Sequence, residues 1–178
     1  MIIGLTGYAG SGKDTVAEIL VREHGFTRYA FADKLREMAY AINPYLSHGE
    51  SLQDCVGAIG WDKAKRTYPA VREFLQNLGV WHRDNIGVDF WVHQVFMQWD
   101  ADDYPKAVIT DVRFPNEAHF IRKNFGQLWR VNRPGVGPVN GHISEQLDLA
   151  ADATIWNGGT VAQLMLKVHQ LVREEQAA

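Results

Sequence analysis

Short apolar runs alternate with longer amphipathic stretches along the chain. The apolar runs are rich in β-branched residues, as expected for buried strands, and lie at residues 2–6, 27–31, 106–110, 128–131 and 153–156. The amphipathic stretches repeat their apolar residues every three or four positions, which predicts helices at 13–24, 33–42, 69–79, 89–99, 115–124 and 160–175. A further short helix is expected from Ser144 to Leu149.

The order of these elements indicates an α/β fold, because alternating strands and helices form a parallel sheet with helices on both faces. A long helical insertion at about 33–100 separates the second strand from the third. Its residues 43–68 are broken by glycines and fit neither pattern, so we assign no element there. We expect one domain over residues 1–178, in which this insertion and a loop rich in Gly and Pro at about 132–145 are candidates for mobile parts that close over a substrate.

Composition narrows the classes of function. A net charge of −3 provides no overall basic field, which argues against a nucleic-acid polymer as partner. The single cysteine, Cys55, cannot form an intrachain disulfide, and no two histidines have the spacing of a zinc site. The N-terminus lacks the pattern of a signal peptide, and no run of 18 apolar residues occurs. These features predict a cytosolic protein without a membrane span.

The segment from Gly7 to Lys13 fits the pattern G-x-x-x-x-G-K and lies between the first predicted strand and the first predicted helix. Glycines allow the backbone to curl so that its N–H groups point inward, where they and the helix N-terminus favour an anion. The lysine adds a positive charge beside the outer phosphates. The segment therefore predicts a nucleoside triphosphate site, with Gly10, Ser11, Gly12 and Lys13 as its candidate residues.

The residue after Lys13 departs from the usual pattern, because Asp14 stands where Ser or Thr commonly contacts Mg²⁺. A carboxylate is a suitable oxygen ligand for Mg²⁺, so Asp14 is a candidate for the metal site. Alternatively, Thr15 supplies the hydroxyl and Asp14 caps the helix. The sequence leaves both arrangements open.

A second acidic motif follows the predicted strand 106–110. Asp111 comes at the C-terminal end of that strand, and such ends line the ligand crevice of doubly wound sheets. Asp111 is therefore expected to face the phosphates and to help orient Mg²⁺ or water. Arg113 is a candidate for a bidentate phosphate contact at the same edge. Glu117 could cap the next helix, pair with Arg113 or contact a substrate.

The insertion carries arginines that could bind a second anion. An acceptor monophosphate carries two negative charges, and Arg36, Arg72 and Arg83 together could provide the cations for it. Gln76 lies four residues after Arg72, on the same helix face. Of the aromatic residues nearby, Trp81, Phe90 and Trp91 are expected in the core, although one of them could stack on a base. In the later loop, an arginine such as Arg130 or Arg133 could stabilise charge on a transferred phosphoryl group.

Several of these segments together resemble bacteriophage deoxynucleoside monophosphate kinases over nearly the whole chain. The segments are Gly-Tyr-Ala-Gly-Ser-Gly-Lys-Asp-Thr (7–15), Phe-Ala-Asp-Lys-Leu (31–35), Arg-Glu-Phe-Leu-Gln-Asn-Leu-Gly (72–79), Asp-Val-Arg-Phe-Pro-Asn-Glu (111–117), His-Ile-Ser-Glu (142–145) and Ala-Asp-Ala-Thr-Ile-Trp-Asn-Gly-Gly-Thr (151–160). The resemblance implies a P-loop nucleoside monophosphate kinase fold, with helices on both faces of a five-stranded parallel sheet in the order 2-3-1-4-5. It also implies ATP and Mg²⁺, a deoxynucleoside monophosphate acceptor and a role in supplying precursors for phage DNA synthesis.

The resemblance also implies roles for individual residues. Lys13 would grip the donor phosphates, Arg133 looks like the lid arginine, and the loop with Asn157 and Thr160 would pass near the donor base. The positions that would lie near the acceptor or the metal are Asp33, Arg72, Gln76, Asp111 and Arg113.

Other readings remain open from the sequence. A dephospho-CoA or phosphomevalonate kinase could share the fold, since fold alone does not define the acceptor. A non-catalytic nucleotide-binding switch is a third reading, although it would have no use for a second set of arginines. A homodimer is compatible with the sequence, and no N-K-x-D signature for guanine is present.

Overall fold

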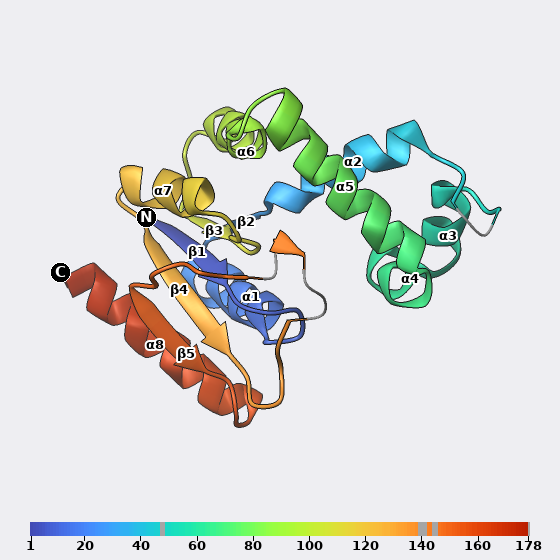
Figure 1. Ribbon diagram of the computed structural model, residues 1–178. Helices are drawn as coiled ribbons and strands as arrows, with labels where there is room; N and C mark the ends of the chain where they lie inside the picture. The colour runs from blue at the N-terminus through green and yellow to red at the C-terminus, as the bar shows by residue number, and fades with distance from the viewer. Residues whose placement is uncertain (47–48, 139–141, 144–145, 178) are drawn as a thin grey trace. The chain divides into compact units, whose positions relative to one another are not determined.

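The computed structural model describes residues 1–46, 49–138, 142–143 and 146–177. It divides into two compact units (Figure 1). The sheet unit comprises Met1–Ala30 and Val95–Ala178, and the helical unit comprises Phe31–Gln94. The helical unit thus falls where the sequence predicts an insertion at about 33–100.

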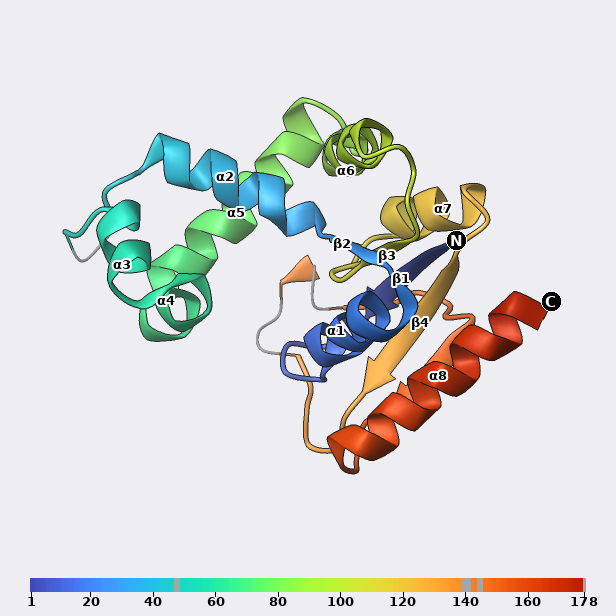
Figure 2. The same ribbon diagram turned by 180° about the vertical axis from the view of Figure 1, so that it is seen from behind.

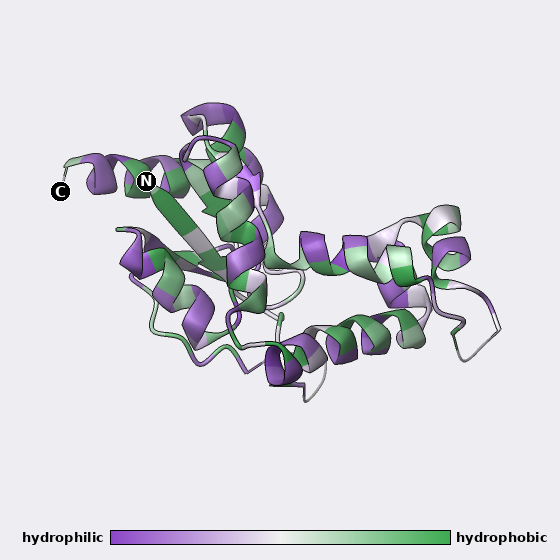
Figure 3. Ribbon diagram, turned by 90° about the horizontal axis from the view of Figure 1, so that it is seen from above, coloured by the Kyte–Doolittle hydropathy of each residue, from purple (hydrophilic) through white to green (hydrophobic). Residues whose placement is uncertain are grey.

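The sheet unit contains five parallel strands in the order β2-β3-β1-β4-β5, which confirms the predicted order. The strands are β1 (Ile2–Thr6), β2 (Thr27–Tyr29), β3 (Ala107–Ile109), β4 (Gln127–Asn132) and β5 (Ala153–Trp156). The central strand β1 is buried throughout, as its unbroken apolar sequence predicts. Figure 3 shows this central part of the sheet mainly in the green of hydrophobic residues.

Helices cover both faces of the sheet. On one face, α1 (Lys13–His24) and α8 (Val161–Ala177) lie side by side (Figure 2), and their buried residues share a core with Ile3 and Leu5 of β1. Gly4 points the other way, toward α7 (Pro115–Lys123), where a Cβ atom would meet Ile121 Cδ1 at 2.3 Å. Successive residues of β1 thus face helices on opposite sides of the sheet, which gives the predicted three layers of helices, sheet and helices.

The helical unit is built from α2 (Phe31–Ile42), α3 (Leu52–Ile59), α4 (Trp61–Thr67), α5 (Pro69–Asn85) and the first part of α6 (Phe90–Ala101). It has its own buried cluster, which includes Ala39, Leu52, Ala64 and Val71, each fully buried. A separate core is typical of a part that folds as a compact body.

Two helices occupy the stretch 43–68, where the sequence pattern allowed no assignment. α3 begins after Ser51, whose side chain accepts a hydrogen bond from the backbone N–H of Asp54. α4 begins after Gly60, which has a φ of 76° and separates the two helices. A serine cap before an apolar stretch is a recognisable start signal, so α3 could have been found from the sequence.

Three other predictions of element bounds need correction. The predicted helix 69–79 continues to Asn85, because the burial of His82 outweighs the cost of about 1 kcal/mol for a glycine inside a helix. The second strand ends at Tyr29 and α2 starts at the buried Phe31, two residues earlier than expected.

The short helix expected at 144–149 lies partly outside the described residues, and its described part, 146–149, is not helical. There Leu147 has a φ of 48°, and the carbonyls of Leu147 and Leu149 both accept hydrogen bonds from the Arg130 guanidinium. Carbonyls held in this way are not available for helical hydrogen bonds.

Candidate active site

The glycine-rich loop between β1 and α1 is wound tightly by three residues with positive φ. These angles are 144° at Gly7, 82° at Gly10 and 104° at Gly12. A Cβ atom at Gly7 would lie 2.4 Å from the Val131 carbonyl oxygen, and one at Gly12 would lie 2.2 Å from the Asn157 side-chain nitrogen. Gly7 therefore requires glycine for its backbone angle and for lack of space. Gly12 requires it for its backbone angle, and a Cβ there would also displace the Asn157 amide.

The Lys13 ammonium lies across this loop. Its Nζ donates to the carbonyls of Gly7 at 2.7 Å and Tyr8 at 2.8 Å. Lys13 is also the first residue of α1, so its charge adds to the positive end of the helix. The arrangement concentrates positive charge and N–H groups at one loop, as an anion site requires.

Two hydroxyl groups beside the loop are buried without a partner. Among the residues that the structure describes, neither Ser11 Oγ nor Thr6 Oγ1 makes a hydrogen bond. Ser11 is 1% exposed, so water does not reach its side chain freely. A buried polar group without a partner costs about 1–3 kcal/mol, and an oxygen-rich ligand in the loop would remove that cost at Ser11.

Candidate metal ligands lie at two places, the first turn of α1 and the residue pair that follows β3. Asp14 is exposed and Thr15 is half-buried, both in the first turn of α1. Asp111 follows β3, whose extension is held to β1 by a hydrogen bond of 3.1 Å from Val112 N–H to the Leu5 carbonyl. No group of three or more His, Cys, Asp or Glu that could hold a metal is found in the described part of the chain. Mg²⁺ bound with a nucleotide needs only one or two carboxylates beside phosphate oxygens and water, so these residues fit that ion.

Glu117 caps the N-terminus of α7. One oxygen of this buried carboxylate accepts from the backbone N–H of Arg113 at 2.7 Å and of Phe114 at 3.0 Å. The cap is one of the three options that the sequence left open for Glu117. It also fixes the backbone of Arg113, which is half-buried beside the C-terminal end of β3.

Arg133 and Asn157 reach the loop from two other segments of the sheet unit. Arg133 Nη1 lies 3.5 Å from the Gly10 carbonyl oxygen, and Asn157 Nδ2 donates to the Ser11 carbonyl at 2.8 Å. Thr160 instead caps α8 by exchanging hydrogen bonds with Gln163. The structure thus brings Arg133 and Asn157 to the loop, whereas Thr160 is occupied by the start of a helix.

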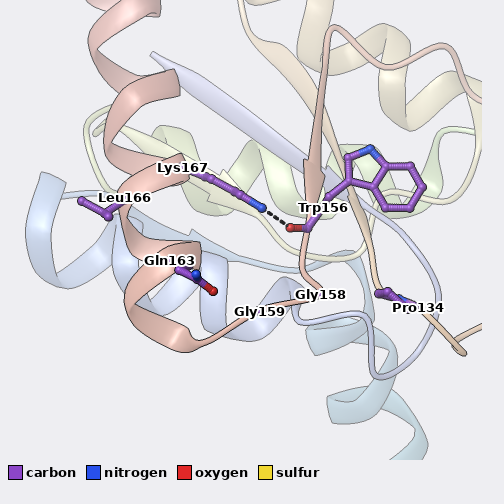
Figure 4. Close-up of a pocket in the computed structure, with 7 residues that line it drawn as sticks. All are labelled: Pro134, Trp156, Gly158, Gly159, Gln163, Leu166 and Lys167. Carbon is purple, nitrogen blue, oxygen red and sulfur yellow. Dashed lines mark hydrogen bonds between the residues drawn. The ribbon is translucent and has the colours of Figure 1, made fainter.

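An open hollow of about 460 Å³ lies between the end of β5 and the start of α8 (Figure 4). Its walls are Pro134, Trp156, Gly158, Gly159, Gln163, Leu166 and Lys167. The Trp156 side chain is 61% exposed, and Lys167 donates to the Trp156 carbonyl at 2.5 Å. Trp156 directly precedes Asn157, so the hollow adjoins the glycine-rich loop through that residue. No motif in the sequence indicates this role for Trp156.

The acceptor candidates in the helical unit fall into two groups. Arg36 forms an ion pair of 3.3 Å with Asp33 on α2, and the half-buried Arg72 and Gln76 lie on one side of α5. Arg83 follows Arg72 by 11 residues, about 16 Å along the helix, so it does not join this group.

The aromatic residues beside Arg83 form a small cluster. Trp91 is 4% exposed, its indole N–H donates to the Gly79 carbonyl at 3.1 Å, and it packs edge-on against Phe90. Trp81 is 54% exposed, so the expectation that it lies in the core is wrong, and its ring is more accessible than that of Trp91. Base stacking by Trp91 therefore stays a prediction, and Trp81 offers an alternative surface for it.

Lys65 of α4 joins the first group, although the sequence offered no element in which to place it. Its Nζ lies 2.9 Å from Asp62 Oδ1, and its side chain is 23% exposed. Burial, together with the positive charges of Arg36 and Arg72, lowers the pKa of Lys65 against the opposing effect of Asp62. The hydrogen bond from Lys65 lowers the pKa of Asp62 in turn.

None of the helices in the described ranges is long and apolar enough to cross a membrane.

Comparison with known proteins gives a consistent family relationship. Residues 50–168 match the family model described as "Deoxynucleotide monophosphate kinase". A protein of Acanthamoeba polyphaga mimivirus, with the name "Putative deoxynucleotide monophosphate kinase", is 30% identical over 158 residues, which cover 82% of this chain and 80% of that protein.

Solved structures share the fold at low sequence identity. Shikimate kinase from Aquifex aeolicus has a TM-score of 0.52 at 12% identity and covers 100% of this chain and 99% of its own. Dephospho-CoA kinase from Campylobacter jejuni has a TM-score of 0.51 at 14% identity, covering 98% and 96%. The Thermus thermophilus protein TT1252 has a TM-score of 0.52 at 19% identity, covering 98% and 97%. These similarities support an α/β kinase fold, as predicted from the sequence.

Proposed function

Because the chain belongs to the deoxynucleotide monophosphate kinase family, we propose that it transfers the γ-phosphoryl group of ATP to a deoxynucleoside monophosphate. The observation that carries the proposal is the glycine-rich loop, in which Lys13 and the partnerless Ser11 hydroxyl accompany three positive-φ glycines. The products would be ADP and a deoxynucleoside diphosphate, a precursor for DNA synthesis.

The donor phosphates would bind in the loop, where the Ser11 hydroxyl gains an oxygen partner and Lys13 moves its N–H donors from backbone carbonyls to phosphate. Mg²⁺ would be held by Asp14 or Thr15 together with Asp111, and when bound it neutralises charge on the phosphates. The hollow beside Trp156 and Asn157 is our candidate for the base and ribose of the donor.

The acceptor phosphate would bind among the cations of the helical unit, with Arg36 and Arg72 as the main contacts. Gln76, one turn after Arg72, would donate a hydrogen bond to the acceptor phosphate. Asp33 would hold the Arg36 guanidinium in position for that phosphate. Arg83 and an aromatic ring near the other end of α5 would contact the nucleoside. Glu117 contributes by fixing Arg113, and a direct contact of its own with the acceptor stays a prediction.

In the reaction, an oxygen of the acceptor phosphate forms a bond to the γ-phosphorus while the bond from that phosphorus to the β,γ-bridging oxygen breaks. Little proton transfer is needed, so the protein contributes position and charge. Lys13, Arg113 and Arg133 are the cations we assign to the moving group and the leaving ADP. Each would stabilise negative charge that grows in the transition state.

The test is consumption of Mg-ATP by the purified protein with a panel of acceptors. The panel contains the four common deoxynucleoside monophosphates, their ribonucleotide counterparts, dephospho-CoA and phosphomevalonate. We expect turnover with at least one deoxynucleoside monophosphate and slow hydrolysis without an acceptor. Turnover with a non-nucleotide alone would assign the helical unit's cations to another substrate, and no turnover with any acceptor would overturn the kinase proposal.

A further inference from the structure

Three cations, one on each of three helices, follow or precede residues of the buried cluster in the helical unit. The buried cluster of this unit includes Ala39 of α2, Ala64 of α4 and Val71 of α5, all at 0% exposure. Lys65 and Arg72 directly follow two of these residues, and Arg36 lies one helical turn before the third. α2 and α4 both pack against α5 (Figure 1), and Lys65 lies close enough to Arg36 and Arg72 for their positive charges to act on it.

Among the described residues, the three cations Arg36, Lys65 and Arg72 form ion pairs with only two carboxylates. Asp33 pairs with Arg36 and Asp62 pairs with Lys65, but no carboxylate there forms an ion pair with Arg72. Both existing pairs join residues three apart on one helix, and the Asp62 side chain is 79% exposed, so each contributes little stability. Three cations therefore share two solvent-facing carboxylates, and a net positive charge remains.

Holding Lys65 in this position has an energetic cost. Its side chain is largely buried, and the two neighbouring guanidinium groups oppose its charge. Such a cost is typical of a site arranged for an anion, because a bound anion reverses the repulsion.

We propose that Lys65 completes a three-cation site with Arg36 and Arg72 that binds the dianionic phosphate group of the acceptor. This inference rests on the proposed function and adds to it a residue from a helix that the sequence did not reveal. The two guanidinium groups suit two-point contacts with phosphate oxygens, whereas the ammonium acts as a compact charge on a flexible stem. The site recognises a phosphate monoester and carries no information about the base.

A purely structural role for Lys65 makes a different prediction. If Lys65 served only to pair with Asp62, then Asp62→Asn and Lys65→Met would have the same consequences. If Lys65 binds phosphate, the two substitutions act in opposite directions, because Asp62→Asn removes a competing anion. Lys63→Met is the matched control, since Lys63 is an exposed lysine on the same helix.

The experiment measures, by calorimetry without ATP, the affinity of the full chain for each deoxynucleoside monophosphate and for the corresponding nucleoside. Lys65→Met should weaken monophosphate binding at least tenfold and leave nucleoside binding within about twofold. Lys65→Arg should recover most of the loss, while Asp62→Asn should keep or tighten binding. Lys63→Met should match the wild type. In turnover assays, Lys65→Met should raise the acceptor KM tenfold or more and leave the ATP KM unchanged.

Two results would overturn the inference and leave the kinase proposal intact. One is normal monophosphate affinity in Lys65→Met, and the other is an equal loss in Lys65→Met and Asp62→Asn with a lower melting temperature in both. If the wild type phosphorylates none of the monophosphates, the proposed function fails. In that case, the affinity of the wild type and of Lys65→Met for inorganic phosphate decides the inference. A tenfold lower affinity in Lys65→Met supports it, and an unchanged affinity overturns it.

Discussion

The two candidate anion sites of this protein are built in different ways. In the sheet unit, the glycine-rich loop presents backbone groups, and contacts such as Asn157 to the Ser11 carbonyl hold its shape. In the helical unit, the cations are the ends of long side chains from α2, α4 and α5, and their position depends on how the helices pack. Few substitutions are tolerated in the glycine-rich loop, because its shape depends on the backbone. In the helical unit, a substitution can remove one cation and leave the others in place.

Lys13→Ala should produce the largest effect, because Lys13 places a full positive charge across the backbone-built loop. Removing charge stabilisation of about 3 kcal/mol or more should lower kcat/KM by at least a hundredfold. Steady-state kinetics with saturating acceptor would measure this, with Lys123→Ala on α7 as an exposed control. Wild-type turnover by Lys13→Ala would contradict the assignment of the loop.

Gly12→Ala should come next, because a Cβ at a φ of 104° is strained and would also meet the Asn157 amide. We expect a loss of about 1–3 kcal/mol, divided between ATP affinity and thermal stability. Gly137→Ala is the matched control, since its Cβ would meet nothing within 4 Å and its φ is not positive. Equal behaviour of the two variants in ATP titration and melting would show that the loop is not rigid.

Arg113→Ala distinguishes the donor side from the acceptor side. Arg113 belongs to the sheet unit, but we expect its guanidinium to contact the acceptor or the transferred group. The substitution should raise the acceptor KM about tenfold and change the ATP KM less, since a charged hydrogen bond contributes about 1.5–3 kcal/mol. Equal changes in the two KM values would move Arg113 to the donor site.

The smallest effect concerns a histidine pair that lies away from both sites. His24 Nε2 and His169 Nδ1 are 2.7 Å apart, between the last turn of α1 and α8. Burial lowers the pKa of His24, helped by the charges of His169, Lys106 and Arg173 and opposed by Glu23. Because the folded-state pKa lies below the unfolded value of about 6.5, the unfolded chain binds more protons as the pH falls.

Stability should therefore be fully present above pH ~6.5 and decline below it. The pair is partly exposed to solvent, so we expect a loss under ~1 kcal/mol, which is less than about 4 °C in Tm. Melting curves between pH 7.5 and 5.5 would measure it, and His24→Gln should remove part of the decline. His93→Gln, at an exposed position, should behave as the wild type. A steeper decline in His24→Gln would contradict this account.

Most elements of the sheet unit could be predicted from its sequence, with the end of β2 and the helix expected at 144–149 as the exceptions. β1 and α1 have the predicted bounds because a continuous apolar run, a glycine-rich turn and a glycine at the helix end are all local signals. The helical unit was harder to predict. α3 and α4 are short and lie between glycines, and α5 passes through Gly79 because packing outweighs its weak propensity.

The sequence by itself determined the α/β class and the glycine-rich loop, because the alternating patterns and the motif can be read from neighbouring residues in the chain. That Gly10, Ser11, Gly12 and Lys13 hold ATP stays a prediction. Only the tertiary structure decided that Lys65 lies with Arg36 and Arg72, that Arg83 lies apart from them, and that His24 meets His169. Charge clusters of this kind form between helices that are distant in sequence. No periodicity records them, since their geometry follows from how buried residues such as Ala39, Ala64 and Val71 bring the helices together.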